Sequence, residues 1–232
     1  MTDSFQPSLG IVFAAAGHSE RFGSEEKLLA PYHGVPLFCH SLLTLVPVAA
    51  SAVLVVSPEK EASMRLALQQ HLPKALLARV QITLGGASRA ESVWRGLQEL
   101  SKLPVPPALV AVHDAARPLV TQRILLACCQ TVQTQGGGAI PAHRVCDTIH
   151  QVNGQGVVTH TPRREALWAA ETPQVFPFPL LCQAFETVAW RTSPPTDEGA
   201  LLLQSGLAPV QIVENPDANP KITFCHELAA LP

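Results

Sequence analysis

The chain has 232 residues, of which 47% are hydrophobic and 15% are charged. This length and apolar content suffice for a full hydrophobic core, so we expect a single domain over residues 1–232. The formal net charge is −2 and no run of lysines or arginines occurs, which argues against a protein that binds nucleic acid by neutralising its phosphates. The expected partner is a small molecule.

The six cysteines lie in apolar surroundings, without a Cys-x-x-Cys pair or a spacing typical of a zinc site. We therefore predict reduced core cysteines in a cytoplasmic protein. The N-terminal residues lack the positive charge and the apolar stretch of a signal peptide, and no segment approaches about 18 uninterrupted apolar residues. No membrane partner is expected.

Short runs rich in Val, Ile and Ala alternate along the chain with longer stretches of helical period. This alternation is typical of parallel strands covered by crossover helices, and it predicts an α/β, Rossmann-like fold with a largely parallel sheet flanked by helices. The expected strands are residues 11–15, 52–57, 80–84, 109–113, 139–142 and 210–213. The expected helices are residues 36–45, 59–72, 89–102, 122–135, 180–191 and 197–204, with Pro36 in a first turn and Thr196 as an N-cap.

The first strand leads into Ala15, Ala16 and Gly17, and two cations follow at Arg21 and Lys27. Small residues at a strand end let backbone N–H groups approach a phosphate, and the cations would neutralise its charge. The segment contains neither Gly-x-Gly-x-x-Gly nor a P-loop, which argues against a dehydrogenase or a P-loop ATPase. Tight packing alone is the structural alternative for these small residues.

Residues 145–152 and 157–161 alternate apolar and polar side chains around Asn153-Gly154-Gln155-Gly156. This pattern predicts a β-hairpin arm over about residues 143–164. A projecting hairpin has little of its own to pack against, so it either folds back or pairs with another subunit. We favour the second arrangement, which predicts a homodimer.

Several segments resemble one family of nucleotidyltransferases, the 2-C-methyl-D-erythritol 4-phosphate cytidylyltransferases. The first is the strand and loop from Ile11 to Lys27. The others follow in the family's order: GGASRAESV at 85–93, VHDAARP at 112–118, DT at 147–148, ETPQ at 171–174, TDE at 196–198 and NPKIT at 219–223. The resemblance covers residues from about 11 to 227.

The resemblance implies roles for residues around a CTP site. Gly86 and Ser92 match positions that hold the cytosine and nearby nucleotide groups. Asp114 follows a predicted strand at the edge where open α/β sheets bind ligands. The matching aspartate lies beside the nucleotide and its Mg²⁺, and whether Asp114 contacts the metal or the ribose is left open. His113 is expected to end a buried strand and not to act as an acid or base.

A second group of positions is implied to hold the polyol phosphate. Arg117, Thr148, Thr172 and Lys221 match residues that bind methylerythritol phosphate. Arg164 matches an arginine that reaches the substrate from the neighbouring subunit through the arm, so the active site would be shared. Thr148 and Thr172 also have plain structural explanations, in a strand and in a turn before proline.

The implied reaction is in-line attack of a phosphate oxygen on the α-phosphorus of CTP, with pyrophosphate leaving. The phosphate is already ionised at neutral pH, so no general base is needed. Arg21, Lys27 and Lys221 are the expected catalytic cations, with Mg²⁺ or another divalent cation as cofactor.

Three residues depart from the family pattern: Glu26 stands where proline is common, Ala87 where an acid is frequent, and Pro220 where an aliphatic residue is common. Because Glu26 and its neighbour Glu25 carry negative charge near the triphosphate, the loop is expected to turn them outward.

Two other functions remain open. The first is a cytidylyltransferase for another polyol phosphate, such as ribitol 5-phosphate, which would share the CTP loop and differ in the substrate pocket. The second is a nucleotide-binding regulatory module without turnover. Retention of Arg21, Lys27 and Lys221 argues against the second.

Overall fold

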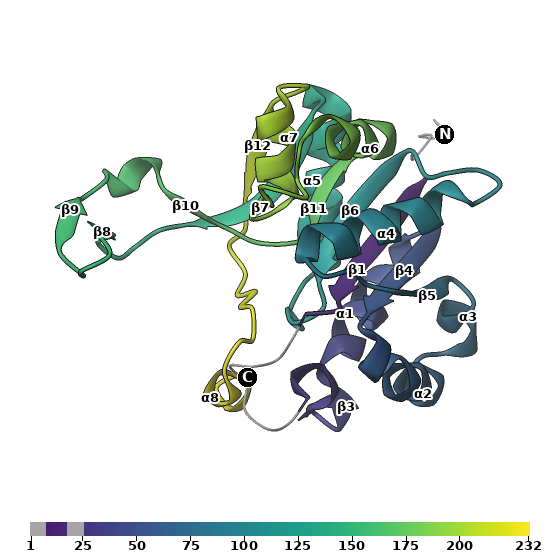
Figure 1. Ribbon diagram of the computed structural model, residues 1–232. Helices are drawn as coiled ribbons and strands as arrows, with labels where there is room; N and C mark the ends of the chain where they lie inside the picture. Colours follow the sequence, from purple (N-terminus) through teal and green to yellow (C-terminus); the bar gives the residue numbers. More distant parts are fainter. Residues whose placement is uncertain (1–7, 18–25) are drawn as a thin grey trace, which may run out of the picture.

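A mostly parallel sheet with helices on both faces forms the body of the protein (Figure 1). The computed structural model describes residues 8–17 and 26–232, and within them the central sheet has eight strands in the order β10-β7-β11-β6-β1-β4-β5, with β12 paired to β7. The strands are β1 (Leu9–Ala15), β4 (Ser51–Val56), β5 (Val80–Leu84), β6 (Leu109–Asp114), β7 (Gly138–Arg144), β10 (Trp168–Ala170), β11 (Gln174–Pro177) and β12 (Val210–Glu214).

The strands predicted from the sequence are all present, each within two residues of its predicted ends. They form parallel pairs, since β1 pairs in parallel with β4 and β6, β4 with β5, and β7 with β12. The predicted α/β, Rossmann-like class is therefore confirmed.

The sequence did not predict β10 and β11, which run antiparallel to β7. Both pair along the same strand, and the N–H of Glu171 continues the ladder between them by donating to the carbonyl of Pro141 at 2.8 Å. β11 then inserts between β7 and β6. Two prolines bracket the β11 segment and Trp-Ala-Ala in β10 has no β-branched residue, so neither segment carries an ordinary strand pattern.

The helices also follow the predicted order. They are α1 (Leu37–Leu45), α2 (Glu61–His71), α4 (Arg89–Ser101), α5 (Gln122–Gln135), α6 (Phe178–Thr187) and α7 (Glu198–Ser205). Two cap predictions were wrong by one position: Pro36 precedes the first turn of α1, and Asp197 caps α7 in place of Thr196. The carboxylate of Asp197 accepts the N–H of Ala200 at 2.7 Å, which satisfies one of the free donors at the helix start. The short helices α3 (Lys74–Leu77) and α8 (Cys225–Ala229) were not predicted.

β1 is buried on both faces, as a central parallel strand requires. Its residues Ile11 and Phe13 pack into an apolar cluster with side chains of α1, α2 and α5. Val12 points to the other face, into a cluster with side chains of α4, α6 and α7. The two clusters fix the position of the strand end that follows them.

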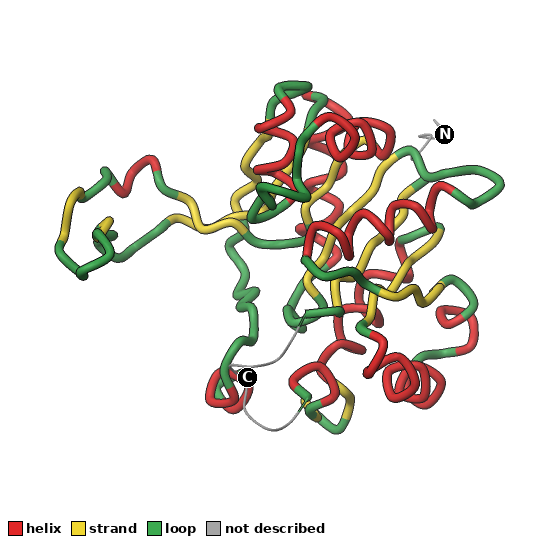
Figure 2. Tube along the Cα trace, in the orientation of Figure 1, coloured by secondary structure: helices red, strands yellow, loops and turns green. Residues whose placement is uncertain are grey.

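The predicted hairpin is confirmed, with shorter strands, as β8 (Gln151–Val152) and β9 (Val158–His160). Asn153 organises the turn, because its side-chain oxygen accepts N–H groups of Gln155 and Val157 at 3.0 Å each. The arm extends away from the sheet and does not fold back onto it (Figures 1 and 2). Its root is the pairing of β7 with β10, so it ends nearer residue 168 than residue 164.

The cysteines are all free thiols, and three of them lie in the core as predicted: Cys39, Cys128 and Cys129. Cys146 and Cys225 are exposed, so the prediction of six core cysteines was wrong for these two. Within residues 8–17 and 26–232, no helix combines the length and the apolar character that a membrane span requires.

Candidate active site

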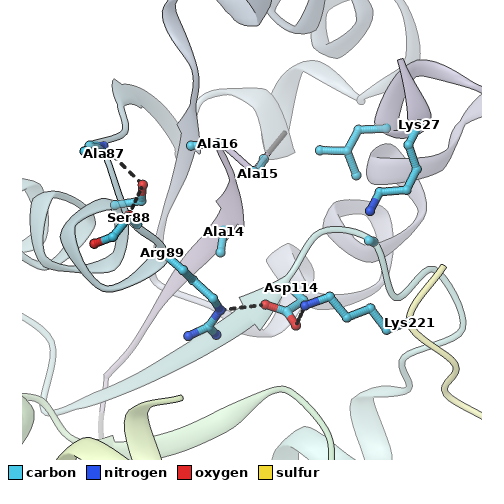
Figure 3. Close-up of a pocket in the computed structure, with 14 residues that line it drawn as sticks. Ala14, Ala15, Ala16, Lys27, Ala87, Ser88, Arg89, Asp114 and Lys221 are labelled. Atoms are coloured by element: carbon cyan, nitrogen blue, oxygen red, sulfur yellow. Dashed lines mark hydrogen bonds and ion pairs between the residues drawn. The ribbon is translucent and has the colours of Figure 1, made fainter. Parts of the chain in front are cut away.

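The carboxyl ends of β1 and β6 and the loop before α4 enclose a cavity of about 300 Å³ (Figure 3). Ligands of open α/β sheets bind at this edge because the loops that follow parallel strands meet there. Most residues predicted to bind or activate the nucleotide line this cavity: Ala15, Ala16, Gly17, Lys27, Gly86, Ser92, Asp114 and Lys221. The predicted catalytic residue Arg21 lies outside the residues that the structure describes.

Small residues bring the strand end and the neighbouring loop into close approach. A Cβ atom on Gly85 would lie 2.4 Å from the Cβ atom of Ala16 and 2.7 Å from the hydroxyl of Ser92. Only glycine fits there, because real Cβ atoms do not approach other heavy atoms so closely. The close packing leaves the backbone of Ala15, Ala16 and Gly17 as one wall of the cavity.

The loop opposite this wall is held by the first turn of α4. The N–H of Gly86 donates to the Ser92 hydroxyl at 3.1 Å, and that hydroxyl donates to the carbonyl of Ser88 at 2.9 Å. The N–H of Ala87 donates to the Glu91 carboxylate at 2.9 Å, and this bond and Arg95 lower the pKa of Glu91. Gly86 and Ser92 therefore line the cavity and are hydrogen-bonded to each other. Ser92 thus has a structural role in holding the loop, besides any contact with a ligand.

Asp114 stands at the centre of the charged groups. One carboxylate oxygen lies 3.2 Å from Nε of Arg89 and the other lies 2.8 Å from Nζ of Lys221 (Figure 3). Burial alone would raise the pKa of Asp114, but the attraction of Arg89 and Lys221 outweighs it and holds the pKa well below its usual range. Asp114 is therefore ionised throughout the physiological range.

Arg89 was part of a recognised motif but was not predicted as a site residue. Its guanidinium makes a two-pronged pair with buried Glu198, at 2.7 and 3.0 Å, besides its contact with Asp114. Burial lowers the pKa of Arg89, and the two carboxylates raise it by more. A cation at the positive end of a helix dipole is unfavourable by itself, so Arg89 as the first residue of α4 was a signal for a carboxylate partner.

The segment after β12 brings Lys221 to the cavity, and a buried glutamate holds that segment. The Glu171 carboxylate accepts hydrogen bonds from Nδ2 of Asn215 and Nδ2 of Asn219, at 2.8 Å each. Asn219 also donates to the carbonyl of Thr172 at 2.9 Å. The two motifs at residues 171–174 and 219–223 thus meet in space, which explains why both contain polar residues that are nearly inaccessible to solvent.

A second hollow of about 170 Å³ adjoins the first, and Arg89, Asp114 and Lys221 border both. Arg117 and Thr172, predicted to bind the polyol phosphate, lie in its wall. Arg117 donates to the carbonyl of Asn219 at 2.6 Å. The hydroxyl of Thr172 accepts the backbone N–H of Asp114 at 3.1 Å, so Thr172 also positions the central carboxylate.

Two predicted substrate residues are not brought to these hollows within one chain. Thr148 and Arg164 border a separate hollow of about 380 Å³ in the arm, where Arg164 donates to the carbonyl of Cys146 at 3.1 Å. The prediction that Thr148 lies in a strand was wrong, because only Gln151 and Val152 of that segment pair with β9. The substrate contacts of Thr148 and Arg164 stay predictions, and the contact of Arg164 is the one predicted to come from a neighbouring subunit.

Lys27 extends its amine into the cavity from the side opposite Ala87 and Ser88 (Figure 3). The preceding residue, Glu26, was expected to turn outward. Glu26 is not among the residues that line the cavity; its carboxylate makes an ion pair with Lys60 at 3.0 Å, and its side chain is 24% exposed. The structure does not describe Glu25.

The described residues of the site offer few metal ligands. Within the described residues, no group of three or more His, Cys, Asp or Glu side chains is arranged to hold a metal ion. Asp114 is the one carboxylate among the described cavity-lining residues. Mg²⁺ commonly uses one or two carboxylates together with substrate phosphates and water, so the donor set fits an ion that arrives with a triphosphate.

His113 is buried in β6, as predicted, and a fixed pattern of hydrogen bonds surrounds it. Its Nε2 lies 3.3 Å from the carbonyl of Arg117 and its Nδ1 lies 3.1 Å from the Thr172 hydroxyl. Because that hydroxyl already accepts the N–H of Asp114, its own hydrogen is available for Nδ1, and the ring is neutral with its hydrogen on Nε2. Burial lowers the pKa of His113 from 6.5 to about 4, against a smaller opposing effect of Asp114.

The pKa of His113 predicts a pH-dependent stability. Between pH 6.5 and about 4 the unfolded chain protonates this histidine and the folded chain does not, so the free energy of unfolding falls as the pH falls through this interval. The expected loss from this residue is about 3 kcal/mol. Urea unfolding across the interval should show a steeper dependence for the unmodified chain than for His113→Gln. Parallel curves for the two proteins would contradict the assignment.

A Rossmann-like sheet with small residues and Lys27 around a cavity at the end of its first strand, and a second charged hollow beside it, has the features expected of a nucleotidyltransferase. The comparisons with known proteins narrow this class. The family model described as IspD, 2-C-methyl-D-erythritol 4-phosphate cytidylyltransferase, matches residues 9–231. The chain belongs to this family.

Individual relatives are similar in sequence to this chain over nearly its whole length. A 2-C-methyl-D-erythritol 4-phosphate cytidylyltransferase of Desulforamulus reducens is 37% identical over 91% of this chain and 89% of that protein. One of Microcystis aeruginosa is also 37% identical, over 94% and 95%. Among solved structures, the enzyme of that name from Thermus thermophilus has a TM-score of 0.75 and 27% identity, covering 95% of each chain.

Proposed function

We propose that this protein transfers the cytidylyl group of CTP to 2-C-methyl-D-erythritol 4-phosphate. The products are 4-diphosphocytidyl-2-C-methyl-D-erythritol and pyrophosphate, and the reaction belongs to the non-mevalonate isoprenoid pathway. The observation that carries the proposal is the pair of adjoining hollows that share Arg89, Asp114 and Lys221, in a chain that matches the family over residues 9–231. Two anionic substrates need two such compartments with a common border.

In the proposed reaction, CTP occupies the larger hollow with its phosphates against the backbone of Ala15, Ala16 and Gly17. A phosphate oxygen of the polyol phosphate in the smaller hollow attacks the α-phosphorus. The new O–P bond forms as the bond to the β-phosphate oxygen breaks, and pyrophosphate leaves with the electron pair. Lys27 and Lys221 stabilise the negative charge that accumulates on the phosphorus oxygens, so positioning and electrostatics supply the catalysis.

Mg²⁺ is the proposed cofactor, and Asp114 is its candidate protein ligand. When bound, the ion would neutralise charge on the triphosphate and make pyrophosphate a better leaving group. Lys221 lies 2.8 Å from Asp114, so a cation at Asp114 would favour release of the Lys221 amine toward the substrate phosphate. Asp114 would then hold the ion at the triphosphate, and Lys221 would contact the substrate phosphate.

A homodimer with exchanged arms is the proposed assembly. The arm exposes Ile149, Val152, Val157 and Val158, which are 41–57% accessible to solvent. Burying such side chains against a partner is favourable, and an isolated two-stranded hairpin is otherwise marginally stable. A two-fold arrangement would carry Thr148 and Arg164 of one subunit to the hollows of the other.

The exchanged arm predicts complementation between inactive chains. Arg164→Ala and Lys27→Ala chains should each be nearly inactive alone, because each lacks a group in both sites of its own dimer. Unfolding and refolding a mixture should restore about a quarter of the normal activity, since half of the dimers then contain one intact site. A mixture that stays inactive, although light scattering shows dimers, would contradict the exchange.

The cytoplasm is the proposed location. All six cysteines are free thiols, and Cys146 and Cys225 are exposed. Exposed thiols persist where the environment is reducing, as it is in the cytoplasm.

The deciding experiment measures pyrophosphate release with CTP and Mg²⁺, with 2-C-methyl-D-erythritol 4-phosphate and ribitol 5-phosphate in parallel reactions. Strong preference for methylerythritol phosphate is the expected result. Preference for ribitol phosphate would keep the chemistry and overturn the acceptor substrate. If a protein that still binds CTP releases no pyrophosphate with either acceptor, it is a regulatory module.

A further inference from the structure

Lys60 is a buried lysine that none of the sequence motifs includes. It ends the short helical turn η3 (Pro58–Lys60), which follows β4, and only 7% of it is exposed. Its amine donates to the carbonyl of Gly17 at 2.9 Å and pairs with the carboxylate of Glu26 at 3.0 Å. A buried ammonium group is costly unless it is paired and hydrogen-bonded, and these two contacts satisfy it.

The sheet register explains why Lys60 reaches this place. β1 and β4 pair in parallel, with Ala15 opposite Val56, so the residues that follow both strands emerge at the same edge. Gly17 follows β1 as a wall of the nucleotide cavity. Lys60 follows β4 and meets the carbonyl of Gly17 from the adjoining strand.

Lys60 lies close to a negative charge that adjoins Lys27, the carboxylate of Glu26. Glu26 directly precedes Lys27, whose amine enters the cavity (Figure 3). A carboxylate at this point would repel a triphosphate and reduce the effective charge of the lysine beside it. The ammonium of Lys60 neutralises Glu26, and it also attracts the negative end of the Gly17 carbonyl dipole. One cation thereby removes two sources of negative potential from the phosphate cradle.

We propose that Lys60 is a positioning residue for the triphosphate: it fixes the Gly17 end of the cradle and neutralises Glu26, so that Lys27 can act on the nucleotide phosphates. The proposal rests on the proposed function, since it takes the ligand of the cavity to be CTP. It also accounts for the tolerance of glutamate at position 26 in this chain.

The test is a rescue experiment with Lys60→Met, Glu26→Gln and the double variant. Lys60→Met keeps most of the apolar stem and removes the charge, and it should raise the Kd for CTP in calorimetry about tenfold, as expected for loss of one charge-assisted contact. Its KM for the polyol phosphate should stay near that of the unmodified chain. The double variant should recover CTP binding to within about threefold, because the carboxylate whose charge Lys60 offsets is gone.

Lys102→Met is the matched control, because Lys102 forms an exposed ion pair with Glu99 at the far end of α4. It should bind CTP normally. Unchanged CTP binding in Lys60→Met would overturn the proposal. So would an equal loss in Lys60→Met and the double variant, since removal of the Glu26 carboxylate would then bring no benefit and the neutralisation assigned to Lys60 would be wrong. Lys60→Arg retains the charge, and its CTP binding should exceed that of Lys60→Met; a value no better would also contradict the proposal.

Failure of the proposed function gives a different pattern. If the unmodified chain binds CTP but releases no pyrophosphate with either acceptor, the reaction is wrong, and the rescue in CTP binding still decides the role of Lys60. If the unmodified chain does not bind CTP, both proposals are overturned.

Discussion

Lys27→Ala is expected to lower kcat for pyrophosphate release by about 10² to 10³, the usual loss when one preorganised stabilising group is removed. The amine of Lys27 projects into the larger cavity (Figure 3), where we propose that CTP binds, and in the proposed reaction negative charge grows at the α-phosphorus. An interaction that strengthens in the transition state affects kcat more than substrate binding. The KM for CTP should therefore change much less than kcat.

Steady-state kinetics with both substrates varied would measure this effect. Lys74→Ala is a suitable control, because Lys74 is an exposed lysine of α3 that does not line the cavity. It should retain normal kcat. A Lys27→Ala protein with kcat near that of the control, or with an effect confined to KM, would contradict a role in transition-state stabilisation.

Asp114→Asn is expected to lower kcat/KM by at least about 10², and to reduce the free energy of unfolding by roughly 3 kcal/mol, as when one partner of a buried ion pair is removed. Asp114 is 7% exposed and pairs with both Arg89 and Lys221. Asparagine has nearly the same shape but cannot neutralise either cation. Lys221 then loses the partner that orients it toward the border of the two hollows.

Kinetics and urea unfolding of the same preparations separate the two effects. Asp217→Asn is the matched control, because Asp217 pairs with Arg123 at the surface, where both side chains are largely exposed. That variant should behave normally in both assays, since exposed pairs contribute little. Full activity in Asp114→Asn would contradict the central role of this carboxylate.

The pH dependence provides a further check on Asp114. Its pKa is depressed in the folded state, so its ion pairs stabilise the protein above the ordinary aspartate pKa and are lost only as the pH falls through the lower folded value. A loss of activity between neutral and mildly acidic pH therefore belongs to other groups, such as the substrate phosphate.

The sequence predicted the elements whose patterns are local. β1 and β6 are continuous apolar runs, and their ends at Gly17 and Asp114 could be placed at the ligand-binding edge from strand order alone. The hairpin was predictable because Asn153 and Gly156 provide the turn, with Gly156 at a positive φ of 78°. In these regions local propensity and the final fold agree.

Features that depend on distant residues were not predictable. The pair between Arg89 and Glu198 joins helices far apart in the sequence, and Lys60 resembled an ordinary surface lysine beside Glu59 until the register of β1 and β4 placed it. β11 has four residues and lies between two strands, so it forms because of its neighbours and not because of its own preference.

The pairing of β7 with β10 at the root of the arm determines where the chain can accept an insertion and where it cannot. β7 and β10 are registered to each other at the root, with Trp168 opposite Arg144, so an insertion at the exposed tip near Gly154 leaves that pairing intact. One residue added between β10 and β11 would instead reverse the faces of the following strand, displacing Glu171 from Asn219. Over evolutionary time the tip is therefore free to lengthen, while the short junction at residues 171–173 is not.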